Sequence, residues 1–320
     1  MPSSSLPSTP LLPSLSISAI STHSYAAHFN SDFCIGTVPH GGYISASFLQ
    51  VASVHFSSTL HGQNQPDTSI LQLNFLRRTS AGPATFVVKD VKLGRATSII
   101  HVTLVQNDVE EAVAYITQTN CEKETGVSMH TGWSVVPSAP AGRPPEAEKW
   151  EEVTDLPFLG FRKATSHVEL WMPREDARRE LPAGRVDQWM RMRSGERWTN
   201  VHLGYLADYF PLLIEFMEPN GKIGKEEGAV RAGAKFWYPT LVLNLEIKKR
   251  LPADGCEWLR SVVQMRHVRN GRNDLELVLF DEKGDLVAVS HHVCLVVPVS
   301  RNVSERRKDR VNVAGDNSKI

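Results

Sequence analysis

The sequence predicts an α+β fold of two tandem units, each with a long central helix wrapped by an antiparallel sheet. Three observations predict it. The two halves of the 320-residue chain repeat one order of segments: an extended strand, a long apolar helix, then several strands. Short turns separate these strands, which favours antiparallel pairing. A curved antiparallel sheet can bury the apolar side of such a helix.

The first half begins with an extended segment at 24–36 and continues with a helix at 40–60. Within this helix, apolar and small residues recur at spacings of three and four, which is the helical period. Four segments rich in β-branched residues follow a polar loop, and Gly, Pro, Asn and Asp separate them, as expected for strands joined by turns. These strands are expected at 69–77, 84–94, 97–106 and 111–119.

The second half repeats this order. Extended segments at 164–172 and 185–192 precede an apolar helical segment at 200–216. Pro211 interrupts or kinks that helix, because proline lacks a backbone N–H. Four further strands are expected at 240–250, 257–268, 274–281 and 285–297.

The last hairpins of the two halves can be aligned directly. The segment "NDVEEAVAYITQ" (107–118) matches "DEKGDLVAVSHH" (281–292), so Ala114 corresponds to Ala288 and Gln118 to His292. We therefore interpret the halves as a duplication. A segment rich in Pro, Gly and Glu at 120–160 separates them.

The composition narrows the function class. Apolar residues make up 41% and charged residues 22%, as in soluble globular proteins. Lys plus Arg equals Asp plus Glu at 35 each, so no net field favours nucleic acid or an anionic membrane. The four cysteines show neither CxxC spacing nor a zinc-like cluster with histidine. We expect free thiols in a reducing compartment, no metal and no cofactor.

The termini suggest unstructured ends. The first 20 residues are rich in Ser and Pro, and no Lys or Arg precedes Arg77, so neither a secretory signal nor a transit peptide is indicated. The chain ends in Ser-Lys-Ile, which differs from the peroxisomal Ser-Lys-Leu address in its last residue. We expect a cytoplasmic protein, with peroxisomal import as the alternative.

Four short motifs carry a family resemblance. They are "PHGGYISA" (39–46), "LNFLRRTSAG" (73–82), "LADYFP" (206–211) and "GDLVAVSHH" (284–292). With their order along the chain, they resemble the double-hotdog acyl-CoA thioesterases of the thioesterase II type, in the thioesterase-like superfamily. The resemblance implies a disordered N-terminus (1–20), an N-terminal hotdog unit (21–125), a linker (126–160), a C-terminal hotdog unit (161–299) and a polar tail (300–320).

The same resemblance implies hydrolysis of an acyl-CoA thioester, as in fatty acid metabolism. In that family a water is held by an Asp on the second central helix, a hydroxyl on the following strand and a Gln on the last strand. Asp208 matches the Asp. The hydroxyl position falls on Thr240, although the count from the last strand also reaches Val242. The Gln position falls on His292, where this chain departs from the family. If His292 meets Asp208, the pair resembles an imidazole base oriented by a carboxylate.

The glycine pair after His40 gives the remaining site prediction. Helix N-termini present unpaired backbone N–H groups, and the helix dipole favours negative charge there. Such donors can stabilise the oxyanion that forms when a thioester is attacked. Gly41 and Gly42 would let the substrate approach closely, with His40 beside it. The structural alternative is a tight turn or close packing of the helix.

Two other functions remain open at this stage. An enoyl-thioester hydratase or dehydratase would share the fold, but such enzymes usually pair an Asp with a nearby His on the helix segment, and this chain shows no such pair. A non-catalytic acyl-thioester or lipid-binding protein is the second alternative, which the departure at His292 keeps open. We expect an acyl-CoA or other acyl thioester as partner, no nucleic acid, no membrane, and a homo-oligomer.

Overall fold

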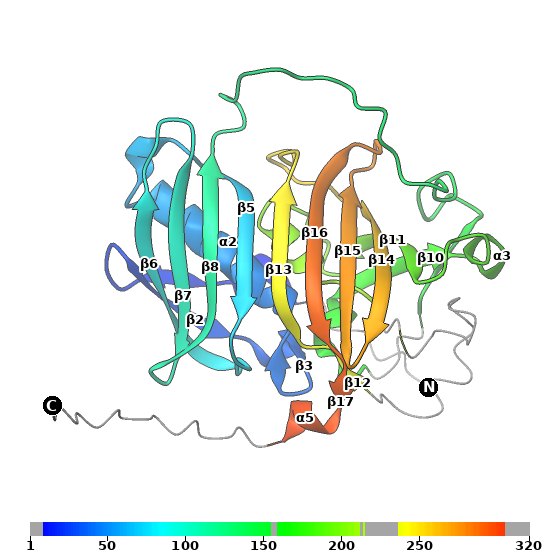
Figure 1. Ribbon diagram of the computed structural model, residues 1–320, viewed down its shortest axis with the longest axis horizontal. Coiled ribbons are helices and arrows are strands. Elements are labelled where there is room, and N and C mark those ends of the chain that lie inside the picture. The colour runs from blue at the N-terminus through cyan, green and yellow to red at the C-terminus, as the bar shows by residue number, and fades with distance from the viewer. Residues whose placement is uncertain (1–8, 155–158, 212–213, 215–235, 305–320) are drawn as a thin grey trace, which may run out of the picture.

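The computed structural model describes residues 9–154, 159–211, 214 and 236–304. These residues form one 13-stranded antiparallel sheet with the long helix against one face (Figure 1). The expected α+β double hotdog is confirmed. The predicted strands are all present, and their ends shift by a few residues.

The sheet runs from the N-terminal unit at one edge to the C-terminal unit at the other. The first unit contributes, in spatial order, β1 (Ile17–Ala19), β2 (Ser24–Phe29), β6 (Gly82–Lys92), β7 (Ser98–Gln106), β8 (Val109–Thr119) and β5 (Asp67–Phe75). The second contributes β13 (Thr240–Ile247), β16 (Leu286–Leu295), β15 (Arg272–Phe280), β14 (Leu259–Arg269), β11 (Arg185–Met192), β10 (Val168–Pro173) and β9 (Trp150–Glu152).

The two units meet at β5 and β13, which pair antiparallel with Leu243 opposite Leu73. Outward from this junction, β8 and then β7 follow on one side, and β16 and then β15 follow on the other. The spatial order is thus repeated about the junction, as a duplication requires. The residues aligned by sequence, Gln118 and His292, lie on the equivalent strands β8 and β16.

Helix α2 (Gly41–Ser57) is buried on almost every side. The sheet covers one side, and α4 (His202–Leu206) crosses the other. The two helices approach closely at Gly204, where an added Cβ would lie 2.7 Å from the Ala46 backbone nitrogen. The sequence predicted a single apolar stripe on this helix, but the helix packs on two faces, so more of its residues are buried than the stripe contains.

The second central helix is shorter than the expected 200–216. It ends at Leu206, and Tyr209 to Pro211 have no helical structure. Proline disfavours helical geometry in the residue before it, so Pro211 accounts for the non-helical Phe210, but α4 already ends four positions earlier, at Leu206. The rest of the expected helix, apart from residue 214, lies outside the described residues.

The chain ends are more ordered than expected. Leu11 and Leu15, from α1 (Leu11–Ser14) and the residue after it, are buried in the main core, and Glu196 accepts hydrogen bonds from the backbone of Leu11 and Leu12. The prediction of disorder is wrong for this stretch, because two buried leucines outweigh the polar composition. Residues 1–8 lie outside the described residues, as do 305–320 with the Ser-Lys-Ile end.

The start of the tail and the described part of the linker both pack against the two units. The expected polar tail begins with α5 (Ser300–Val303), whose Asn302 is buried against the loop before α2. The described part of the linker packs on the outer face of the second unit, where Trp133 stacks on Phe280. The remaining short elements are α3 (Glu175–Arg178), η1 (Ser31–Phe33), η2 (His61–Gln63), η3 (Lys163–His167), β3 (Cys34–Ile35), β4 (Val38–Pro39), β12 (Phe236–Trp237) and β17 (Val297–Pro298).

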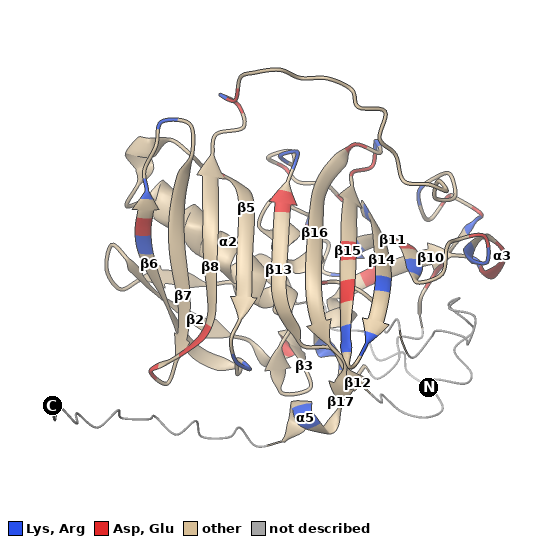
Figure 2. Ribbon diagram, viewed as in Figure 1, with Lys and Arg blue, Asp and Glu red and all other residues tan. Residues whose placement is uncertain are grey.

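Charge is mixed over the described surface. Of the charged residues, strand β14 carries arginines only, the neighbouring β15 carries Arg272, Asp274 and Glu276, and strands β7 and β16 carry no Lys, Arg, Asp or Glu (Figure 2). The longest described helix, α2, has 17 residues. None of the helices in the described ranges combines the length and the apolar character that a bilayer span requires.

Candidate active site

Asp208 lies in the turn that follows α4, and only 5% of the residue is exposed. Its Oδ1 accepts a hydrogen bond of 2.9 Å from the hydroxyl of Thr240, the first residue of β13. The sequence left open whether Thr240 or Val242 stands at the hydroxyl position. Thr240 is the one whose side chain donates to Asp208, and Val242 has no hydroxyl. Because α4 ends at Leu206, the Asp208 carboxylate lies next to the start of β13.

Burial raises the pKa of the Asp208 carboxyl from 3.8 to about 7. Hydrogen bonds from Thr240 and from the backbone N–H of Gly42 lower it, but burial outweighs them. The carboxyl is therefore close to half-ionised at neutral pH. A group with this pKa can accept a proton from water and return it in a later step.

His292 on β16 is fully buried, with Nδ1 at 3.5 Å from Asp208 Oδ1. Its Nε2 is 2.8 Å from the hydroxyl of Ser290. Burial lowers the pKa of His292 to about 4, so the ring is neutral near pH 7. An ionised carboxylate only accepts hydrogen bonds, so the neutral ring faces it with the proton on Nδ1 and accepts from Ser290 at Nε2. In this arrangement His292 offers an N–H, as the family's amide does.

This geometry changes the interpretation of His292. A proton-accepting nitrogen would have to face the substrate, yet Nε2 is held by Ser290 and His292 does not line the cavity described below. The expectation of an imidazole base at this position is therefore not supported, and Asp208 is the group suited to accept the proton. Sequence reasoning missed Ser290, although its spacing of two from His292 puts both on one face of the strand.

His40 caps the N-terminus of α2. The N–H of Gly42 donates to His40 Nδ1 at 3.2 Å, so the neutral ring carries its proton on Nε2, which lies 3.8 Å from Asp208 Oδ2. Burial lowers the pKa of His40 to about 3. Both histidines near Asp208 are thus neutral at pH 7, and neither forms an ion pair that would offset the burial of the carboxylate.

The two glycines differ in what surrounds them. An added Cβ at Gly41 would lie 2.5 Å from Asp208 Oδ2, and Gly41 lines the cavity. An added Cβ at Gly42 would overlap the backbone oxygen of Tyr205 in α4, and Gly42 does not line the cavity. Of the two predicted oxyanion donors, only Gly41 stays a candidate, while Gly42 allows close helix packing.

A cavity of about 790 Å³ opens beside Asp208, between the end of β5, the start of β13 and the loop before α2. Its walls are aromatic and apolar, with four arginines and one carboxylate among the described residues. The main lining residues are His40, Gly41, Phe75, Arg77, Arg78, Phe161, Arg162, Asp208, Phe210, Trp237, Tyr238, Thr240 and Arg301. Of the aromatic residues, Phe210 was a sequence candidate for the lining; Phe161, Trp237, Tyr238, Arg162 and Arg301 were not predicted, because they come from loops and short elements distant in sequence.

Cys294 is the one thiol that touches this group among the described residues, with Sγ at 3.5 Å from the Thr240 hydroxyl. Burial raises the pKa of this thiol far above its usual value. It is therefore protonated at neutral pH and does not supply a thiolate nucleophile. The site chemistry rests on the carboxylate and its donors.

Comparison with known proteins agrees with the fold. Residues 29–119 match the family described as the acyl-CoA thioesterase N-terminal domain, and residues 137–296 match the acyl-CoA thioesterase C-terminal domain. The thioesterase-like protein TwmA of Talaromyces wortmannii is 35% identical over 327 residues, which covers 90% of this chain and 92% of that protein.

Solved structures show the same fold at low identity. The acyl-CoA thioesterase II TesB2 of Mycobacterium marinum is 19% identical with a TM-score of 0.62, covering 90% of this chain and 98% of that one. A hot dog fold protein of unknown function from Alicyclobacillus acidocaldarius is 17% identical with a TM-score of 0.65, covering 90% and 97%.

Proposed function

Because this chain belongs to the acyl-CoA thioesterase family, we propose that it hydrolyses an acyl-CoA thioester with a water that Asp208 activates. Family membership makes it a double-hotdog thioester hydrolase. The observation that carries the more specific proposal is the buried Asp208 carboxyl, which borders the cavity and has a pKa of about 7.

In the first step, the ionised carboxylate of Asp208 takes a proton from water while the water oxygen attacks the thioester carbon. Thr240 donates to Oδ1 at 2.9 Å, and Nδ1 of His292 lies 3.5 Å from the same oxygen. The hydrogen bond from Thr240 holds the carboxylate and the His292 ring packs beside it, so both are assigned as positioning residues. Oδ2 lies close to Gly41, at the wall of the cavity, and is the oxygen that can reach a water there.

The attacked carbonyl oxygen becomes negative and needs donors. The backbone N–H of Gly41, in the first turn of a 17-residue helix, supports this role, since N-terminal N–H groups lack helical partners. When the intermediate collapses, the C–S bond breaks and Asp208 returns the proton to the departing thiolate. The products are a carboxylic acid and free coenzyme A, and no other reactant is required.

The cavity supports an acyl-CoA as the substrate. Among the described residues, four arginines and a single carboxylate line it, and guanidinium groups suit the phosphates of coenzyme A. Arg78 donates to the backbone oxygens of Arg301, Asn302 and Ser304, which are uncharged partners. Aromatic walls and a volume of about 790 Å³ suit the apolar part of a substrate.

The test is a panel of short-, medium- and long-chain acyl-CoAs with a free-thiol assay. We expect CoA release from at least one chain length, and Asp208→Asn should lower kcat by ~10²-fold or more, the usual size of acid–base help. Asp281→Asn changes a buried carboxyl in a distant turn and is the matched control. Absence of release from every acyl-CoA, or full activity in a folded Asp208→Asn variant, would overturn the proposal.

A further inference from the structure

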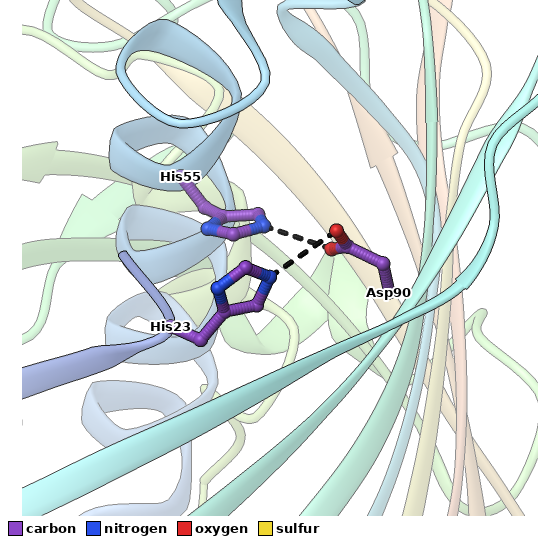
Figure 3. A group of neighbouring side chains, drawn as sticks. All are labelled: His23, His55 and Asp90. Atoms are coloured by element: carbon purple, nitrogen blue, oxygen red, sulfur yellow. Dashed lines mark hydrogen bonds and ion pairs between the residues drawn. The ribbon is translucent and has the colours of Figure 1, made fainter. Parts of the chain in front are cut away.

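A second group of polar side chains lies at the other end of α2, away from the cavity. His23 precedes β2, His55 is in the last turn of α2, and Asp90 is on β6 (Figure 3). The two rings point at one carboxylate: His55 Nε2 is 3.0 Å from Asp90 Oδ1, and His23 Nε2 is 3.2 Å from Oδ2. The proposed hydrolysis makes no use of these residues.

One potential ligand atom from each residue lies within 4.8 Å of the others, and this is the one such group of three among the described residues. A metal ion about 2.0–2.2 Å from each nitrogen and oxygen fits between atoms at these separations. His55 is fully buried, whereas the side chains of His23 and Asp90 are 42% and 25% exposed. The group is thus anchored on the inside and open to solvent on the outside.

The hydrogen bonds behind His55 indicate which ring nitrogen carries the proton. The Tyr25 hydroxyl lies 3.1 Å from the backbone oxygen of Thr22, to which it can only donate, and 2.7 Å from His55 Nδ1. A tyrosine hydroxyl has one proton, so a donation to Thr22 makes it the acceptor of a proton on Nδ1. With that proton on Nδ1, Nε2 presents to Asp90 either a lone pair, which can ligate a metal ion between them, or a second proton, which donates to the carboxylate.

We propose that His23, His55 and Asp90 form a binding site for a divalent transition-metal ion, with Zn²⁺ as the best fit. Two imidazoles and one carboxylate are ligands that zinc accepts, and three protein ligands leave a fourth position for water. Tyr25 behind His55 and the Thr22 hydroxyl, 2.9 Å from His23 Nδ1, are the outer partners that usually orient such ligands.

The position of the site assigns it a structural role. Gly41 and His55 are 14 positions apart on one helix, which corresponds to about 21 Å at 1.5 Å per residue. An ion here is too far away to touch the proposed substrate. It would join the start of β2, the end of α2 and β6, and its positive charge suits the negative C-terminal end of the helix dipole.

The experiment is a calorimetric titration of the full-length, chelator-treated protein with Zn²⁺, with Mg²⁺ as the comparison ion. We expect one equivalent of Zn²⁺ to bind and Mg²⁺ to give no heat. His23→Gln removes one ligand at a half-exposed position and should weaken Zn²⁺ binding by more than the ~10–100-fold typical of losing an outer partner. His28→Gln removes an exposed histidine on β2, the strand that follows His23, and should bind as the wild type does.

Tyr25→Phe tests the outer partner without removing a ligand. It should weaken Zn²⁺ binding by ~10–100-fold. Saturating Zn²⁺ should also raise the Tm of the wild type but not of His23→Gln, because an ion that binds only the folded state stabilises it. Thioester hydrolysis should be unchanged in His23→Gln, so this proposal and the proposed function can fail separately. If Zn²⁺ gives no heat with the wild type, or binds His23→Gln equally well, the group is only a hydrogen-bonded cluster.

Discussion

The hydroxyl of Thr240 donates to Asp208 Oδ1 at 2.9 Å, although the two residues are 32 positions apart in sequence. This bond favours the charged carboxylate, so it opposes the burial that raises the pKa of Asp208 to about 7. The ionised carboxylate is the form that can accept a proton. The proposed activity should therefore rise with pH through about 7 and level off above it.

Thr240→Val should move this rise to higher pH. Loss of a hydrogen bond to a charged group, worth ~1.5 kcal/mol, corresponds to a further increase in the Asp208 pKa of roughly one unit. The measurement is kcat/KM for the best acyl-CoA as a function of pH. Thr240→Ser keeps the hydroxyl and should keep the wild-type profile. An unshifted profile in Thr240→Val would mean that Asp208 is not the titrating group.

His292→Gln should be a mild change. The glutamine restores the family's usual residue, and its amide can donate to Asp208 from the position where Nδ1 of His292 lies 3.5 Å from the carboxylate. With a pKa of about 4, His292 is already neutral where the activity rises, so the rise should remain near pH 7 in the variant. The measurement is again kcat/KM against pH. A loss of ~10²-fold or more would identify the imidazole as the base after all.

The glycines before α2 should separate activity from folding. Gly42→Ala puts a methyl group against the Tyr205 backbone, which cannot move away cheaply, so the Tm should fall. Gly41→Ala puts it against the Asp208 carboxylate, which can rotate, and the gain in helix propensity of about 1 kcal/mol offsets part of the cost. Thermal unfolding and kcat measured on both variants should show a folding defect in the first and mainly an activity defect in the second. The reverse pattern would contradict the assigned roles.

Arg301→Gln should affect substrates that carry the coenzyme A phosphates. The residue is exposed and lines the cavity, so its contact with a phosphate is worth ~0.5–1 kcal/mol, or roughly a two- to fivefold rise in KM. The same acyl group on N-acetylcysteamine lacks the phosphates and should show no change. Arg95→Gln, an exposed arginine outside the cavity, is the control. Equal effects on both substrates would argue against phosphate recognition.

The strands could be predicted because their information is local. Segments such as 97–106 and 185–192 carry β-branched or apolar residues between turn signals, and they form β7 and β11. The helix at 200–216 was predicted too long, because its apolar run continues past Leu206, where the helix ends. Leu11 and Leu15 were hidden in a polar, proline-rich stretch, and only the folded core reveals their burial.

The site could be predicted only where a motif marked it. Asp208 and His292 were identified as a pair through the family resemblance, and their approach to 3.5 Å depends on tertiary packing. The sequence could not give the roles of the two nitrogens of His292, because Ser290 and Asp208 decide them together. The group of His23, His55 and Asp90 left no signal at all, since its members are more than 30 positions apart in sequence and show no metal-binding spacing.

Asp208 should also destabilise the protein at the pH where it acts. Its pKa is about 7 in the folded state and 3.8 for an ordinary aspartate, so the folded protein binds up to one more proton than the unfolded chain between these pH values. Stability contributed by this group is present at low pH and lost as pH rises through about 7. A difference of roughly 3 units corresponds to at most ~4 kcal/mol.

Asp208→Asn should therefore gain stability over the wild type as pH rises from about 4 to 8, while it loses activity. Asparagine resembles the protonated carboxyl and cannot ionise, so the Tm difference between variant and wild type should grow in this window. Asp281→Asn should instead lose stability by a nearly constant amount across this window, because Lys249 beside Asp281 helps to hold the pKa of that carboxyl below its usual value and its stabilising charge is present throughout. Thermal unfolding at several pH values measures both differences. A constant Tm difference for Asp208→Asn would mean that the buried carboxyl does not titrate near pH 7, and the proposed base would then lack the pKa that its role requires.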